Sequence, residues 1–130
     1  MGDTRIGIIY PGDGALDREF WDFAPPGVSL HFTRQPLCTA HVGLESMSGL
    51  VDDGTLDPCA DSLKIIAPAA IGFACTSASF IRGLAGEAAI RRQITEVSGS
   101  PATTTSGGIL GLPRPRPQAG CRRRALCRGG

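Results

Sequence analysis

One stretch, Ala70–Gly83 with the sequence AIGFACTSASFIRG, most constrains what this chain can fold into. An apolar run up to Ala74 stops at Cys75-Thr76-Ser77, and an amphipathic segment follows. A buried strand that ends in a thiol and two hydroxyls before a helix is typical of an α/β protein, in which ligands bind outside the carboxyl ends of parallel strands. A helix N-terminus attracts anions and lowers a thiol pKa. The alternative is that Cys75 is a small core residue, because free cysteine is often buried.

The remaining sequence up to residue 112 alternates between strand-like and helix-like segments. It predicts strands at 5–10, 28–32, 70–74 and 101–104, and helices within 15–23, 33–49, 57–68 and 83–97. The first strand ends at the turn residues of 11–14, and we expect it to be central. Asp57-Pro58 suits a capped helix start with Leu63, Ile65 and Ile66 inward. Leu84, Ile90 and Ile94 recur at helical spacing. Such alternation implies right-handed crossovers and a parallel sheet, which is the α/β class.

The composition of the chain limits the class of protein to which it can belong. With 130 residues, 42% hydrophobic residues and a net charge of +1, the chain reads as one domain of a soluble protein that has no bulk attraction to nucleic acid. It lacks both an apolar run of membrane-spanning length and a signal peptide, so we expect no membrane partner and a cytoplasmic location. Its five cysteines form no CxxC pair, which argues against a disulfide framework and against a zinc site.

The segment after Leu112 differs in kind from the rest. Residues 113–130 hold six arginines and no acidic residue, whereas residues 1–112 hold seven Lys and Arg against twelve Asp and Glu, a net charge of −5. One interpretation is a native, disordered basic tail. The other, which we favour, is a frameshifted or truncated gene, because permitted codons for 113–130 encode a helix end, a basic turn and an apolar strand in the next reading frame. We therefore predict a 1–112 unit and a 113–130 tail, and the nucleotide sequence around codon 112 tests this.

Three segments together carry a family resemblance. ACTSASFIRG, GEAAIRRQI and SGSPATTTSGGIL resemble the aspartate/glutamate racemase superfamily, in its maleate cis-trans isomerase and arylmalonate decarboxylase branch. The resemblance runs from about Arg5 to Leu112. It implies a flavodoxin-like three-layer αβα half-domain with a parallel sheet of about four strands, incomplete at its C-terminus, from a protein of two similar halves. It also allows homo-oligomers among full-length relatives.

The resemblance further implies a cofactor-independent isomerase that acts on a small dicarboxylic acid through a cysteine thiolate. Cys75 matches the cysteine of the N-terminal half, and Thr76 and Ser77 can bind a substrate carboxylate. Alternatives are a racemase-type or decarboxylase-type enzyme, or a non-catalytic truncated product. The decarboxylases lack a cysteine at this position, which weighs against decarboxylation. As a fragment, the chain is expected to be inactive alone.

The remaining site candidates stand at the ends of the first and the fourth predicted strands. Pro11 matches a proline of the family's first loop, but Gly12-Asp13-Gly14 stands where isomerases usually show Ser-Ser-Asn. Asp13 is either a racemase-like acid or a turn residue. At the end of the fourth strand, Thr104 and Thr105 could face the pocket or merely cap the next helix. His31, His41, Cys38 and Cys59 lie outside recognisable motifs, and no residue pattern indicates a metal or a cofactor.

Overall fold

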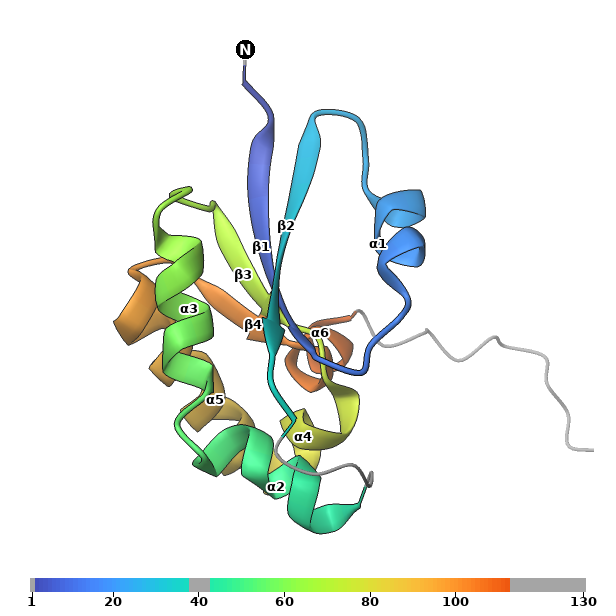
Figure 1. Cartoon of the computed structure of the whole chain (residues 1–130). Coiled ribbons are helices and arrows are strands. Elements are labelled where there is room, and N and C mark those ends of the chain that lie inside the picture. The colour runs from blue at the N-terminus through green and yellow to red at the C-terminus, as the bar shows by residue number, and fades with distance from the viewer. Residues whose placement is uncertain (1, 38–42, 113–130) are drawn as a thin grey trace, which may run out of the picture.

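The computed structural model describes residues 2–37 and 43–112. Ten elements follow one another in the order of Figure 1: β1 Thr4–Pro11, α1 Asp17–Phe23, β2 Val28–Gln35, α2 Leu44–Asp52, α3 Leu56–Lys64, β3 Ala70–Phe73, α4 Thr76–Phe80, α5 Gly83–Ser98, β4 Ala102–Thr104 and α6 Thr105–Gly111. The predictions for Cys38, His41 and the 113–130 tail lie outside the described residues.

The four strands form one parallel sheet in the order β2-β1-β3-β4. In this sheet β1 pairs with β2 from Thr4↔Val28 onward and with β3 from Ile6↔Ala70 onward. The prediction that the first strand is central is therefore confirmed. A parallel sheet flanked by helices confirms the α/β class, and this strand order is the one that flavodoxin-like folds share.

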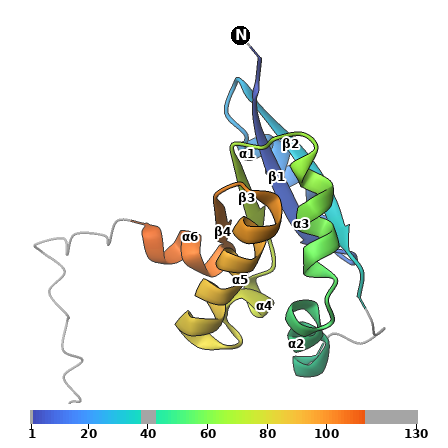
Figure 2. The same ribbon diagram turned by 90° about the vertical axis from the view of Figure 1, so that its left-hand side faces the viewer.

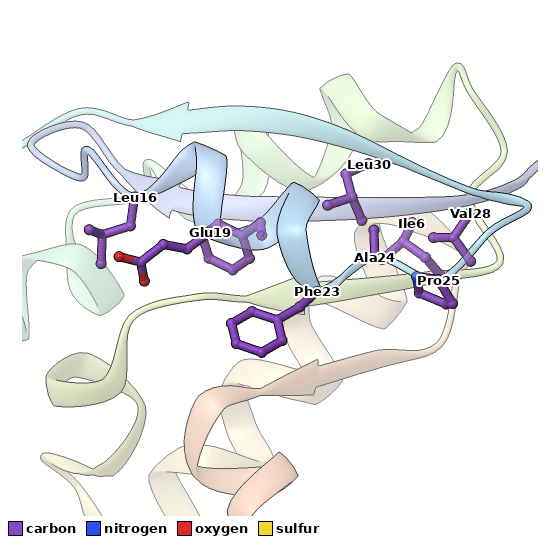
Figure 3. A pocket seen from close by; sticks show the side chains of 9 residues that line it. Ile6, Leu16, Glu19, Phe23, Ala24, Pro25, Val28 and Leu30 are labelled. Carbon is purple, nitrogen blue, oxygen red and sulfur yellow. The ribbon is translucent and has the colours of Figure 1, made fainter.

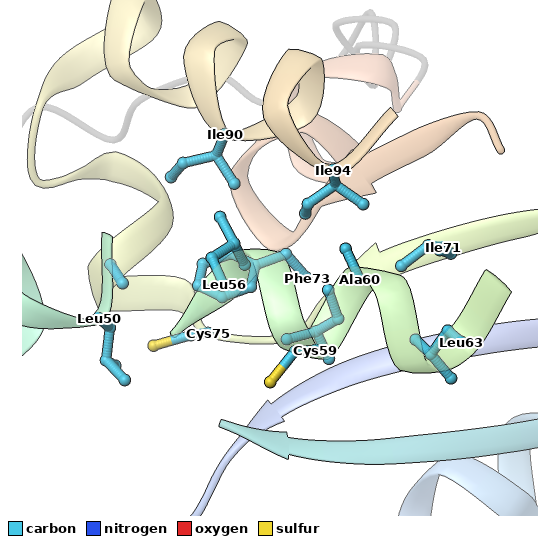
Figure 4. Close-up of a cluster of buried hydrophobic side chains, with 12 residues drawn as sticks. Leu50, Leu56, Cys59, Ala60, Leu63, Ile71, Phe73, Cys75, Ile90 and Ile94 are labelled. Carbon is cyan, nitrogen blue, oxygen red and sulfur yellow. The ribbon is translucent and has the colours of Figure 1, made fainter. Parts of the chain in front are cut away.

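The main core lies between the sheet and the helices α3 and α5. On the sheet, Ile9, Ile71 and Phe73 are fully buried on this face. Figure 4 shows Ile90 and Ile94 pointing from α5 toward Ile71 and Phe73 of β3. Alternate residues of the strands and residues at helical spacing in α5 therefore pack into one hydrophobic cluster, as the sequence pattern predicts.

Helix α1 covers the opposite face over β1 and β2 (Figure 1). Aromatic rings hold it there: Phe20 packs edge-on against Tyr10, with ring centroids 5.3 Å apart, and against Phe32 at 5.5 Å. Edge-to-face pairs of this kind stabilise beyond the area they bury. Figure 2 shows α3 and α5 side by side in front of the sheet on the core face, with α6 beyond α5 on the side away from α3.

Three details of the helix predictions are wrong. The cap position before α3 is Thr55 and not Asp57, which lies in the first turn. Because α3 ends at Lys64, Ile65 falls beyond the helix and is 89% exposed instead of pointing inward. Leu84 is 69% exposed because it lies in the first turn of α5, away from the buried face that carries Ile90 and Ile94.

The loop after α3 contains the one non-glycine residue with positive φ among the described residues, Ala67 at 45°. A left-handed backbone costs alanine roughly 1 kcal/mol or more and costs glycine nothing. We expect Ala67→Gly to raise the free energy of unfolding by about 0.5–1 kcal/mol, measured by urea denaturation. The matched control, Ala89→Gly on the exposed side of α5, should lower it by about 1 kcal/mol. Equal losses in both variants would contradict the expectation.

Candidate functional site

The carboxyl ends of β1 and β3 bring the predicted site residues together. The amide of Ala74 donates to the carbonyl of Ile9 at 2.8 Å, which fixes the chain just before Cys75 beside the end of β1. Cys75 then occupies the N-cap position of α4 in extended backbone conformation, with φ −131° and ψ 104°. The polar residues that follow β3 therefore lie at the edge of the sheet where α/β proteins bind ligands.

A pocket of about 590 Å³ opens at this edge. Among its lining residues are five predicted ones: Pro11, Asp13, Cys75, Thr76 and Ser77. Thr76 and Ser77 are exposed, so their hydroxyl groups are accessible from the pocket. A volume of this order suits a small organic ligand.

Burial dominates the chemistry of Cys75, whose side chain is one of the hydrophobic cluster and is 8% exposed (Figure 4). This burial raises the pKa of the Cys75 thiol above its ordinary value of 9.0. Backbone N–H groups of Ala78 and Ser77 act in the lowering direction, while the charge of Asp13 acts in the raising direction. The expectation of a lowered pKa is wrong, because the five-residue helix α4 provides too little stabilisation to offset desolvation.

The raised pKa has a consequence for stability. A thiol that ionises less readily in the folded protein than in the unfolded chain contributes stability below the unfolded pKa. That contribution is lost as the pH rises through the folded value. Cys59, whose pKa burial also raises, adds to the same effect. Both cysteines therefore favour the folded chain at neutral pH and oppose it in alkaline solution.

Serine side chains anchor the short helix α4. The buried hydroxyl of Ser79 donates to the carbonyl of Thr76 at 2.8 Å and pairs closely with the hydroxyl of Ser106. The amide of Ser106 donates in turn to Ser79 Oγ at 3.2 Å. This contact ties the residues after Cys75 to the start of α6, so the two strand ends form one structural unit.

The structure places Thr104 outside the pocket. Its side chain is 2% exposed, donates to Glu87 Oε1 at 2.9 Å and accepts from the amide of Gly107 at 2.9 Å. This is the geometry of a helix N-cap, in which the hydroxyl makes its hydrogen bonds within the protein and none to a ligand. Thr105, one residue later, lines the pocket instead and donates to the carbonyl of Phe73 at 3.3 Å.

Sequence reasoning missed the apolar wall of the pocket, which is formed by Tyr10, Leu16 and Phe20. Alternation along β1 was the signal for Tyr10, because Tyr10 shares a sheet face with Ile6 and Ile8. The same Leu16 and Phe20 also line a second, apolar cavity of about 440 Å³ under α1 (Figure 3). The site pocket thus combines a polar end with an apolar side.

Across residues 2–37 and 43–112, no three His, Cys, Asp or Glu side chains cluster as metal ligands would. Within the same ranges, every helix is too short or too polar to cross a bilayer.

We expect Cys75 to be alkylated faster than Cys59 at neutral pH. Cys75 lines the open pocket, whereas the thiol of Cys59 donates to the carbonyl of Arg34 at 3.7 Å beneath α3. Because burial raises both pKa values, both rates should lie below that of a free cysteine and should rise steeply toward and above pH 9. Timed iodoacetamide labelling with peptide mass spectrometry measures this. Faster labelling of Cys59 would contradict it.

Known proteins with this fold are found among solved structures. A maleate isomerase from Pseudomonas putida S16 has 24% sequence identity to this chain and a TM-score of 0.63. The match covers 82% of this chain and 46% of the isomerase chain. A liganded variant of arylmalonate decarboxylase, with one glycine replaced by cysteine and one cysteine by serine, is 26% identical with a TM-score of 0.67, covering 82% and 44%. Arylmalonate decarboxylase itself is 25% identical with a TM-score of 0.62.

The chain spans less than half the length of these neighbours. No family model and no curated protein sequence matches it. The similarity in structure agrees with the resemblance that the sequence motifs carry. The chain therefore has the fold of the enzyme branch that contains maleate isomerase and arylmalonate decarboxylase, consistent with an N-terminal half of such a protein.

Proposed function

We propose that this chain supplies one half of the active site of a cofactor-independent isomerase that acts on a small dicarboxylic acid through the thiolate of Cys75. The observation that carries the proposal is the shared pocket: Cys75, Thr76 and Ser77 follow β3 and line one cavity with Pro11 and Asp13 from the end of β1. A nucleophile with hydroxyl donors beside it is the arrangement that covalent catalysis on a carboxylate needs.

The chemistry balances without an external reagent. The thiolate sulfur adds to one carbon of the substrate double bond, and the π electrons move onto the neighbouring carboxylate. The former double bond is then single and rotates, after which the electrons return and the sulfur leaves. In this scheme, Thr76 and Ser77 donate hydrogen bonds to the carboxylate on which the negative charge grows.

The resting state is the thiol, because burial raises the pKa of Cys75. Activation therefore requires a group that takes the proton as substrate binds. Among the described residues, Asp13 is the acidic side chain that lines the pocket. Its alternative role is that of a turn residue, because it lies in the turn where the Gly14 amide donates to the Pro11 carbonyl at 3.0 Å. A partner half that supplies such a group would complete the site.

A second candidate is a decarboxylase-type reaction on a malonate that carries an apolar group. The observation in its favour is the apolar wall of Tyr10, Leu16 and Phe20, which a bare four-carbon dicarboxylate would leave uncovered. Against it stands Cys75 at a position where the decarboxylases lack cysteine. Racemisation, which would use the same pocket, and a non-catalytic product are the remaining alternatives.

Protection of Cys75 from alkylation tests the proposal without requiring turnover. Maleate should slow the labelling of Cys75 in a saturable way and leave Cys59 unaffected, whereas stronger protection by phenylmalonate would favour the second candidate. Thr76→Val should weaken the protection, and Thr95→Val on the exposed side of α5 is the matched control. If neither carboxylate protects Cys75, the proposed function is wrong.

A further inference from the structure

A single arginine near the end of β2 holds the loop that carries Asp13. Arg34 Nη1 donates to the carbonyl of Pro11 at 3.4 Å and to that of Gly14 at 2.5 Å. Arg34 Nη2 contacts both carboxylate oxygens of Asp17, at 2.7 and 2.6 Å. The guanidinium therefore binds the start of the loop, its middle and the first residue of α1.

Tyr10 forms the floor beneath this loop. The guanidinium carbon of Arg34 lies 5.0 Å from the centre of the Tyr10 ring, within cation–π range. The amide of Leu16 donates to the Tyr10 hydroxyl at 3.4 Å. A Cβ atom on Gly14 would lie 2.3 Å from the ring, so only glycine lets the loop approach this closely. The loop is thus held between Arg34 and Tyr10.

We propose that Arg34 is a positioning residue that holds residues 12–16 closed over the edge of the site pocket, so that Asp13 and Leu16 form its wall beside Cys75. Arg34 itself does not line the pocket and touches no reacting atom. The catalytic consequence of this role rests on the proposed function, whereas the closure of the loop is a property of the folded chain and is tested separately.

The geometry requires arginine in particular. The guanidinium is planar and presents donors in a fixed fork, so it can bind a carboxylate with one edge, two carbonyls with another and an aromatic ring with its face. A lysine ammonium keeps the charge opposite Asp17 but cannot reach all four partners at once. A half-exposed ion pair such as Arg34–Asp17 contributes little alone, so the effect comes from the network.

Hydrogen exchange of the backbone amides in 12–16 tests the closure. Arg34→Gln should raise their exchange rate about tenfold or more, and Arg34→Lys should restore part of the protection. The matched control is Arg18→Gln, which removes an arginine from the same region whose exposed contact with Asp22 at 3.9 Å holds no loop. Unchanged exchange in α5 shows that each variant is folded.

The alkylation rate of Cys75 relative to that of Cys59 is a second measurement of the loop's position. A general loss of stability would raise both rates instead of that of Cys75 alone. Arg34→Gln should speed Cys75 labelling at least threefold, because the wall that Asp13 and Leu16 form beside Cys75 is no longer held in place, while Cys59 labelling stays within twofold. Loop exchange within twofold of the parent in Arg34→Gln overturns the proposal. Failure of carboxylates to protect Cys75 would instead overturn the proposed function and leave the loop result standing.

Discussion

The 130-residue chain, assayed alone, should turn over maleate, aspartate, glutamate or an arylmalonate at least about three powers of ten more slowly than a chain that carries a second half. Within residues 2–37 and 43–112, the pocket contains one thiol, Cys75, and its raised pKa keeps it protonated at neutral pH. Removing one member of a catalytic unit commonly costs as much as removing the whole. The open pocket also admits water, which weakens the hydrogen bonds of Thr76 and Ser77.

The decisive experiment compares the 130-residue chain with the product of a gene whose reading frame is repaired near codon 112. If residues 113–130 are out of frame, as their composition predicts, the repaired product gains a second half and its activity. Cys75→Ala in the repaired protein should abolish that activity, and Cys59→Ala should not. Comparable turnover by the short chain, lost on Cys75→Ala, would show that one half suffices and that the interpretation of the tail is wrong.

Phe73→Ala should lower the free energy of unfolding by about 3–5 kcal/mol, which is the usual cost of removing a buried aromatic side chain. Phe73 is fully buried and is the largest such side chain in the core between the sheet and the helices α3 and α5. Because small domains are stable by only about 5–15 kcal/mol, this loss takes much of the total. Urea denaturation followed by circular dichroism measures it.

The matched control is Phe80→Ala, since Phe80 is the same residue type at the end of α4 but is 58% exposed. Its replacement should change stability by about 0.5 kcal/mol or less, as for most surface positions. Similar losses in the two variants would contradict the assignment of the core.

The sheet edge with Cys75 could be predicted because its signals are local. An apolar run, a polar stop and a turn after the first strand lie within a few residues of each other, and parallel pairing follows from the alternation of strands and helices. The pKa of Cys75 could not be predicted in the same way, because its sign depends on how many side chains cover the thiol. The side chains that share a buried cluster with Cys75 come from α2, α3 and α5 as well as from the strands, so the local sequence does not reveal them.

Three other details that the sequence did not predict have a similar cause. Thr104 and Thr105 are neighbours of the same type, and which of them caps α6 depends on a hydrogen bond to Glu87 from another helix. Arg34 has no motif around it, and its partners Pro11, Gly14 and Asp17 become visible only when β1 and β2 pair. Helical spacing predicted that Ile90 and Ile94 are buried. It could not show that Leu84, in the first turn of α5, lies beyond the part of the helix that packs on the core.

The central position of β1 also sets the order in which the nascent chain can fold. Ile6 lies opposite Leu30 in one neighbour and opposite Ala70 in the other, so β1 is paired on both sides only after β3 has been synthesised. Pairings of such long sequence separation form slowly. Cys75 follows β3 directly and is buried only when that strand docks. Until then its thiol is exposed with an ordinary pKa, and this is when the chain is most open to oxidation at the site.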